Sequence, residues 1–244
     1  MSAEPKLDIA DIRKEIDRVD KALLSLIAER LKLASAVRRA KSGIRVWRPS
    51  REESHVRELA AMTEDASTQL VSTIWAELMS ASLAMQGPMQ LHLALTGDAL
   101  DVWSLVRDRF GAALPIKSYP TSSAALAAAY AEDEGVAVLP APGGMQNWWT
   151  ALGPKGAMPD MHILAGLPRT GLRDWPKAVA VATADLASSG TDLTLVMASG
   201  SAPSDRAVLR AEAGDVKLYS YEGFYDASPL DGGAVIGCIP KPLG

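Results

Sequence analysis

The spacing of hydrophobic and polar residues changes once along the chain, at Gly87-Pro88. Up to Gly87, apolar residues recur every three or four positions, which is the period of amphipathic helices. Beyond Pro88, short runs of consecutive apolar residues alternate with helical stretches, which is typical of buried strands in an α/β fold. The pattern predicts a multidomain protein with an all-α domain of three helices over residues 1–87 and an α/β domain over residues 88–244.

The first helix is expected from Leu7 to Lys41, a stretch without Pro or Gly that is closed by Gly43. A helix of this length spans about 50 Å, which is more than a small three-helix monomer covers. We therefore expect a second copy of the chain to bury its apolar stripe in a helical homodimer. The stripe consists of Ile9, Ile12, Ile16, Val19, Leu23, Leu26, Ile27, Leu31, Ala34 and Val37.

The second helix is expected to begin at Pro49-Ser50, where Glu53 has the capping-box spacing from Ser50. The third helix covers the sequence STQLVSTIWAELMSASLAMQ and ends at Gly87-Pro88. After Pro88, strands are expected within residues 91–97, 136–140, 162–168, 178–184, 192–199, 216–224 and 234–240, and helices within 98–110, 122–134 and 203–214. At two helix starts, Thr96-Gly97-Asp98 and Thr121-Ser122-Ser123, we expect N-capping rather than an anion site.

The amino-acid composition limits the binding partners, the cellular location and the metal sites that we expect for this protein. A net charge of -4 gives no electrostatic reason to expect nucleic acid or an anionic membrane surface as a partner. No apolar run approaches the ~20 residues of a membrane span, and the first residues carry acids where a signal peptide has an apolar core. The single cysteine, Cys238, stands in an apolar run and is expected to be buried, so a reducing cytoplasm is the simplest location. The three histidines lack ligand-like spacing, and we expect no metal.

Polar residues on the apolar helix faces form the candidate site. Arg30 and Lys41 are eleven residues apart, about three helical turns, so both cations point the same way. Arg13 precedes Arg30 by about 25 Å along the helix and about 100° around it, so in an antiparallel dimer it would reach the partner's site. Several cations, one carboxylate and neutral hydrogen-bonding groups suit a small dianion, without a nucleophile–base pair or a phosphate loop. The set is Arg13, Arg30, Lys41, Arg51, Glu52, Ser82 and Gln86.

The stretches IRKEIDRVDKALLSLIAERLKLASAVRRAKSG, RPSREES and IWAELMSASLAMQ together resemble the all-α chorismate mutase family. The likeness is to the mutase domain that begins the bifunctional chorismate mutase–prephenate dehydratase proteins. The resemblance implies an entwined dimer of three helices per chain, with one arginine of each site supplied by the partner. It also implies that chorismate is rearranged to prephenate for aromatic amino acid biosynthesis, with no cofactor.

The resemblance also implies a role for each residue. Arg30 and the partner's Arg13 would hold the two carboxylates of chorismate, and Lys41 and Gln86 would donate to its ether oxygen. Glu52 would accept from the ring hydroxyl, and Ser82 and Arg51 would complete the carboxylate pocket. The sequence departs from the family at Arg48, where the family often has an acid, and in a shorter stretch between Lys41 and Arg51.

Residues after Pro88 weakly resemble a shortened, degenerate prephenate dehydratase. The Thr-Arg-Phe motif of that family is absent, and only Thr183 stands near its expected place. Two other functions stay open. One is a related reaction at the same cage, such as that of an isochorismate pyruvate lyase or an aminodeoxychorismate mutase. The other is a non-catalytic regulator that binds a metabolite.

Overall fold

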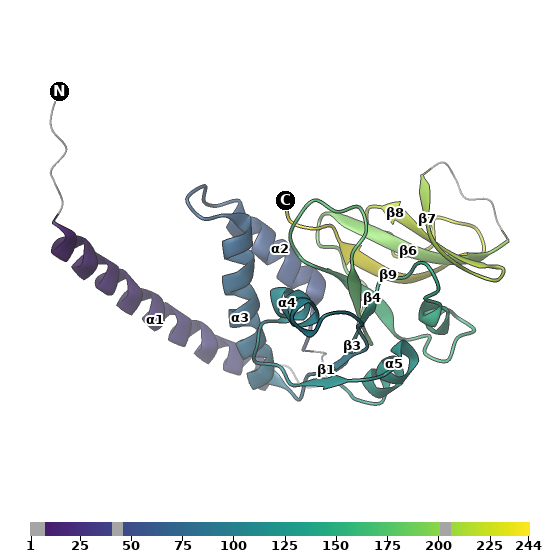
Figure 1. Cartoon of the computed structure of the whole chain (residues 1–244), viewed down its shortest axis with the longest axis horizontal. Coiled ribbons are helices and arrows are strands. Elements are labelled where there is room, and N and C mark those ends of the chain that lie inside the picture. The colour runs from purple at the N-terminus through teal and green to yellow at the C-terminus, as the bar shows by residue number, and fades with distance from the viewer. Residues whose placement is uncertain (1–7, 41–45, 201–205) are drawn as a thin grey trace, which may run out of the picture. The chain divides into compact units, whose positions relative to one another are not determined.

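A computed structural model describes residues 8–40, 46–200 and 206–244. The chain forms two compact units, Met1–Gly43 and Ile44–Gly244. In its described residues the first unit forms one helix, and the second unit contains the other described helices and a large sheet (Figure 1). The predicted order, an N-terminal helical region followed by an α/β region, is confirmed.

Helix α1 (Ile9–Ala40) has 32 residues and is about 48 Å long. Its charged residues pair locally along the helix, as Lys14 with Asp11 at 2.8 Å and Arg18 with Glu15 at 2.7 Å. Its predicted apolar stripe is solvent-exposed along most of its length, including Ile12, Ile16, Val19, Leu23 and Leu26. The predicted helix end at Lys41–Gly43 lies outside the described residues.

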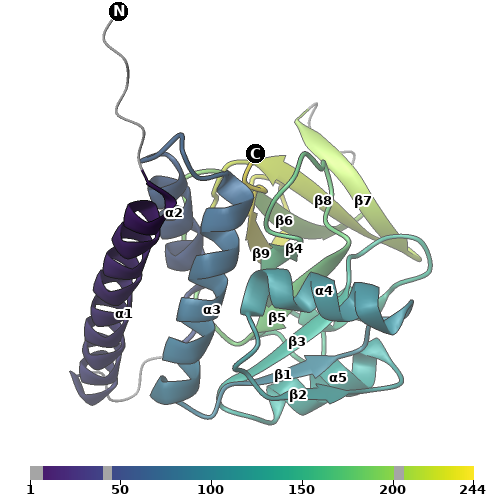
Figure 2. The same ribbon diagram turned by 60° about the vertical axis from the view of Figure 1, so that its left-hand side comes forward.

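Helices α2 (Pro49–Ala60) and α3 (Thr68–Gln86) form an antiparallel pair joined by residues 61–67 (Figure 2). The Ser67 hydroxyl accepts from the Leu70 amide at the start of α3, and the helix stops at Gly87 as expected. The predicted capping box at Ser50 is wrong. Arg48 holds the N-cap position without a side-chain hydrogen bond, and Ser50 lies inside the helix because Pro49 already occupies its first turn.

The described residues of the second unit form one nine-stranded sheet in the order β2-β1-β3-β5-β4-β9-β6-β8-β7. Strands β2, β1 and β3 are parallel, and the other neighbours are antiparallel except for β4 with β9. The strands are β1 (Gln90–Leu93), β2 (Ile116–Ser118), β3 (Gly135–Pro140), β4 (His162–Leu167), β5 (Ala178–Ala182), β6 (Asp192–Ser199), β7 (Ala207–Ala213), β8 (Val216–Glu222) and β9 (Ala234–Pro240).

The parallel part of the sheet is covered on both faces. Helix α4 (Ala99–Phe110) packs on the face that carries Val136 and Val138 of β3, whereas α5 (Ser122–Tyr130) packs on the face of Ala137 and Leu139. Successive residues of a strand point to opposite faces, so α4 and α5 lie on opposite sides of the sheet. A short 3₁₀ helix, Trp148–Leu152, adds two buried tryptophans to the α5 side.

All seven predicted strand regions contain a strand, but the helix predicted over residues 203–214 is wrong. Residues Ala207–Ala213 form β7, which pairs with β8 in an antiparallel hairpin. The turn is Gly214-Asp215, and Gly214 has a φ of 62°, a conformation that favours glycine in two-residue hairpins. Residues 203–205 of the predicted helix lie outside the described part of the chain.

Helices α2 and α3 share their cores with the α/β fold. Trp47 and Leu83 pack in one cluster with Leu91 of β1 and Phe110 of α4. Val56 and Met79 pack with Leu243 near the C-terminus. The apolar faces of α2 and α3 are therefore buried within the second unit, against α4, β4 and β9.

Candidate functional site

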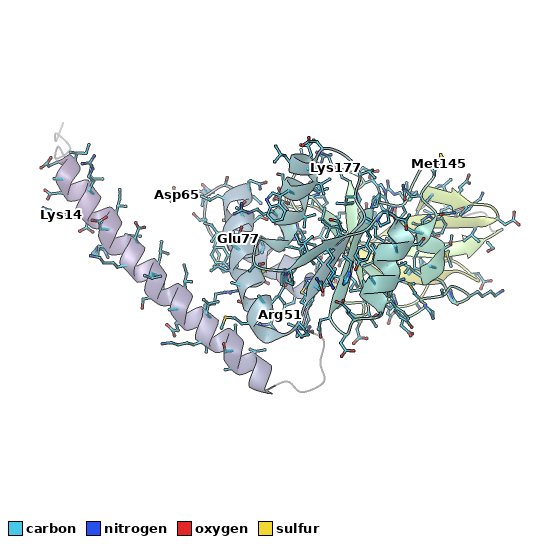
Figure 3. The ribbon with its side chains drawn as sticks, turned by 60° about the horizontal axis from the view of Figure 1, so that its bottom comes forward. Lys14, Arg51, Asp65, Glu77, Met145 and Lys177 are labelled. Atoms are coloured by element: carbon cyan, nitrogen blue, oxygen red, sulfur yellow. The ribbon has the colours of Figure 1, made fainter. Side chains whose placement is uncertain are left out.

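Four of the predicted site residues lie at one end of the α2–α3 pair. Arg51 and Glu52 are in the first turn of α2, and Ser82 and Gln86 are in the last turns of α3. Because the two helices are antiparallel neighbours, these turns lie at the same end of the pair (Figure 2). Arg51 is exposed (Figure 3), whereas Ser82 is buried and its hydroxyl donates to the Leu78 carbonyl at 2.7 Å.

The other three predicted residues belong to the first unit. Arg13 is exposed and Arg30 half-buried on α1, about 25 Å apart along the helix. Lys41 lies outside the described residues. The meeting of all seven residues in one cage therefore stays a prediction.

Glu52 contacts two arginines of the α/β fold. Its carboxylate lies 3.9 Å from Arg109 at the end of α4 and 3.9 Å from Arg169 after β4. Burial raises the pKa of Glu52 above its usual range, and the positive charges of Arg109 and Arg169 oppose this shift. The carboxyl group predicted to accept from a substrate hydroxyl is thus part of a buried charge cluster.

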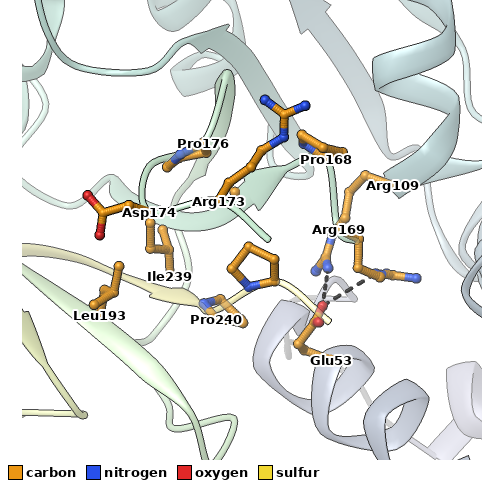
Figure 4. A pocket seen from close by; sticks show the side chains of 12 residues that line it. Glu53, Arg109, Pro168, Arg169, Arg173, Asp174, Pro176, Leu193, Ile239 and Pro240 are labelled. Carbon is orange, nitrogen blue, oxygen red and sulfur yellow. Dashed lines mark hydrogen bonds and ion pairs between the residues drawn. The ribbon is translucent and has the colours of Figure 1, made fainter. Parts of the chain in front are cut away.

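Glu53 is the centre of this cluster, and the sequence did not identify it as such. Its side chain is 2% exposed, and its Oε2 accepts a short hydrogen bond from Arg109 Nη1. Arg169 Nε lies 3.3 Å from the same carboxylate (Figure 4), and Arg57 Nη2 lies 3.9 Å from its other oxygen. We define Arg57, Arg109, Arg169, Glu52 and Glu53 as the buried charge cluster.

The helical spacing of residues in α2 and α4 could have revealed part of this cluster from the sequence. Pro49, Glu53, Val56 and Ala60 follow the three- and four-residue steps of a buried helix face, and Pro49, Glu53 and Val56 are buried. Arg109 likewise follows Val106 by three positions on the buried face of α4. A charged residue at such a position indicates a buried ion pair, because an unpaired charge there would be too costly in free energy.

Arg169 is fully buried, and its environment disfavours its charge. Burial, together with repulsion from Arg109, lowers the pKa of Arg169 to about 10, while Glu53 and Glu52 act in the opposite direction. The guanidiniums of Arg109 and Arg169 lie within 4 Å of the carboxylates of Glu52 and Glu53, a distance at which opposite charges attract each other strongly in a buried site. Such a cluster fixes α2 on the fold, because removing one partner leaves a buried charge unpaired.

The other polar motifs have structural roles. Asp98 caps α4 by accepting from the Leu100 amide at 2.9 Å, and Thr121 caps α5 by accepting from Ala124 at 3.2 Å. Cys238 is buried as predicted, and burial raises the pKa of its thiol to about 12. Over residues 8–40, 46–200 and 206–244, no helix has the length and apolar character needed to span a membrane.

Comparison with known proteins identifies a family for part of the chain. No curated protein and no solved structure matches the sequence. Residues 12–87 match the family model of chorismate mutase type II, a segment that includes most of α1 and all of α2 and α3. All seven predicted site residues fall within this segment. The match supports an isomerase of the chorismate mutase type at the level of the family.

Proposed function

We propose that the protein is a cytoplasmic chorismate mutase, which converts chorismate to prephenate in aromatic amino acid biosynthesis without a cofactor. The observation that carries this proposal is the match of residues 12–87 to chorismate mutase type II, because it covers every member of the predicted cage. We also propose that the chain has two functional domains, a mutase domain over residues 1–87 and an α/β domain over residues 88–244.

The proposed chemistry needs no covalent catalyst. A Claisen rearrangement is unimolecular, so the enzyme holds the substrate in its compact conformer and stabilises charge that grows on the ether oxygen. Arg30 and the partner's Arg13 would bind the carboxylates, with Arg51 and Ser82 completing their pocket. Lys41 and Gln86 would donate to the ether oxygen, and Glu52 would accept from the ring hydroxyl.

The proposed site requires a dimer. The exposed apolar side chains of α1 are a large surface to leave in water, and a second α1 supplies a matching face. In an entwined antiparallel arrangement, Arg13 of each chain would enter the site of the other chain. The α/β region would then be an auxiliary domain, which we propose is derived from a prephenate dehydratase that lost its activity.

One observation supports a second candidate, a non-catalytic regulator that binds a metabolite on the same helices. Glu52 is 3.9 Å from both Arg109 and Arg169, so its carboxylate already has charged partners besides a substrate hydroxyl. A regulator would tolerate this arrangement, because it needs no acceptor aligned with a reacting ring.

Incubation of the purified protein with chorismate tests these functions. A mutase depletes chorismate absorbance and yields prephenate, whereas a regulator leaves chorismate unchanged. A parallel incubation with isochorismate tests the lyase, which would release pyruvate and leave salicylate. Lys41→Ala should lower the rate by about 10²–10³-fold or more, because it removes a fixed donor to the developing charge. Lys32→Ala is the matched control, because Lys32 is exposed and lies nine residues, or half a turn in angle, from Lys41. Unchanged chorismate would refute the proposed activity.

A further inference from the structure

A small cavity lies beside the buried charge cluster, between α2, the turn after β4 and the end of β9 (Figure 4). Its volume is about 20 Å³, and its wall includes Glu53, Arg109 and Arg169 together with Pro168, Pro176 and Pro240. One water-sized group needs about 10–15 Å³. The cavity therefore has room for a single atom or for the end of a carboxylate group, and a tetrahedral oxyanion is too large for it.

The arginines bring unused hydrogen-bond donors to this cavity. Arg169 is fully buried, and none of its Nε, Nη1 and Nη2 atoms makes a hydrogen bond to a described group, although Nε has an ionic contact with Glu53. Arg109 Nε is likewise buried without an acceptor. Buried donors, especially charged ones, are nearly always satisfied in native proteins. The carboxylate oxygen Oε1 of Glu53 also lacks a donor, but the buried donors without a partner outnumber it, so the group missing from this place accepts hydrogen bonds.

The unsatisfied guanidinium donors, rather than a net positive charge, favour a negative acceptor. Among the described residues, the three guanidiniums of the cluster lie within 4 Å of the carboxylates of Glu52 and Glu53. Asp108 adds a third negative charge that attracts Arg169, but its two oxygens accept from the Arg169 backbone amide at 2.9 Å and from Gln69 at 3.1 Å and leave the guanidinium donors of Arg169 without an acceptor. Burial and the neighbouring Arg109 lower the pKa of Arg169, which is the effect that a bound anion would offset.

We propose that this cavity binds one small monovalent anion, either a halide or the carboxylate end of a small organic acid, through the guanidiniums of Arg169 and Arg109. The prolines of the wall have no N–H to offer, so the arginines are the donors that select the ligand. Leu193 and Ile239 make the remaining wall apolar, which disfavours strongly hydrated multivalent ions. Exposed Arg173 and Asp174 line the side open to solvent.

The bound anion would have a structural effect on α2. It would reduce the repulsion between Arg109 and Arg169, the two residues that hold Glu53, and so stabilise the attachment of α2 to the α/β fold. This inference is independent of the proposed mutase activity, because it concerns only residues of the second unit and is tested without chorismate.

Crystals of the full chain grown separately in bromide and in acetate provide the direct test. We expect an anomalous bromide peak within hydrogen-bonding distance of Arg169 Nη1 or Nη2, or a planar acetate at the same place. The two crystal forms distinguish a halide site from a carboxylate site. A water molecule or empty density in both crystals would overturn the proposal.

Thermal melting of the full chain provides a second test in solution. At constant ionic strength, chloride or acetate should raise the melting temperature in a saturable way, whereas the monovalent tetrahedral anion methanesulfonate, which is too large for the cavity, should not. Arg169→Lys should weaken this effect about tenfold or more, because lysine keeps the charge but loses the planar fork of donors. Arg107→Lys is the control, since Arg107 is exposed on the same helix α4 and pairs with Glu77. Equal responses of both variants, or the same stabilisation by methanesulfonate, would refute a specific site.

Discussion

Helix α1 and the α2–α3 pair have the same amphipathic period but opposite environments. On α1, Ile16 is 54% and Leu23 is 51% exposed, and the ion pairs join exposed residues three positions apart. On α2, Val56 is fully buried and Glu53 pairs with an arginine 56 positions along the chain. A periodic stripe thus indicates that a helix face is to be buried, but not which surface buries it.

The two regions also differ in whether their ion pairs are exposed or buried. The exposed pairs of α1 add little to stability, because water and salt screen them. On α2, Glu53 is buried and Glu52 is largely buried. Their partners are indispensable because a buried charge left alone is costly, although a buried ion pair is itself only weak evidence of stabilisation. We therefore expect substitutions on α1 to change association and those on α2 to change folding.

The largest effect is expected from Leu23→Asp on α1. A carboxylate in the middle of the apolar stripe would be buried without a partner in the proposed dimer, so the dimer should dissociate. Sedimentation analysis would show monomers, with mutase activity lost. Lys21→Asp, on the opposite side of α1, should leave the dimer intact. A dimeric Leu23→Asp protein would mean that α1 does not form the interface.

Glu53→Gln should lower the free energy of unfolding by about 3–5 kcal/mol, because Arg109 and Arg169 would lose their closest buried counter-charge. Urea denaturation measures this change. Glu15→Gln on α1 removes an exposed carboxylate that pairs with Arg18, and it should have no measurable effect. Similar losses in the two variants would contradict the distinction between the two regions.

Glu52 should make stability depend on pH with an unusual sign. Because its pKa is raised in the folded state, the folded protein binds more protons than the unfolded chain above the ordinary glutamate pKa of about 4.3. Its contribution to stability therefore falls as pH rises from there through the folded pKa. Glu52→Gln should remove this fall, as measured by urea denaturation at a series of pH values. An unchanged profile would show that Glu52 does not titrate in this way.

The smallest effect concerns the start of α2. Arg48→Asp places a good N-cap residue where no side chain now caps the helix, and we expect about 0.5–1 kcal/mol of stabilisation. Arg48→Ala removes the cation without adding a cap and serves as the control. Equal stability of the two variants, by urea denaturation, would mean that the exposed helix start does not accept a cap.

Most of the fold could be predicted from the sequence because its strands are buried apolar runs. The three-residue strand β2 was missed, since only Ile116 among its residues is even half-buried. Strand β7 was predicted as a helix because Val208, Leu209 and Ala211 also fit a helical spacing; its pairing with β8 decides its conformation. An edge strand with two exposed aliphatic residues gives no clear alternation.

The candidate site was predictable only in part. The residue types and spacing of the cage are visible in the sequence, and the family match covers them. The partners of Glu53 are not visible in the sequence, because Arg109 belongs to α4 and Arg169 to the turn after β4. Only the folded sheet brings these two residues to α2. Ion pairs between distant segments depend on tertiary structure, which local periodicity does not encode.

Mixed dimers of Arg13→Ala and Lys41→Ala chains test the shared site most directly. Each variant alone should be nearly inactive on chorismate. After joint unfolding and refolding, random pairing makes about half of the dimers mixed, and each mixed dimer has one intact site and one site with both lesions. About a quarter of the wild-type mutase activity should therefore return. No recovery, with mixed dimers confirmed by mass, would contradict a site that is completed by Arg13 of the partner chain.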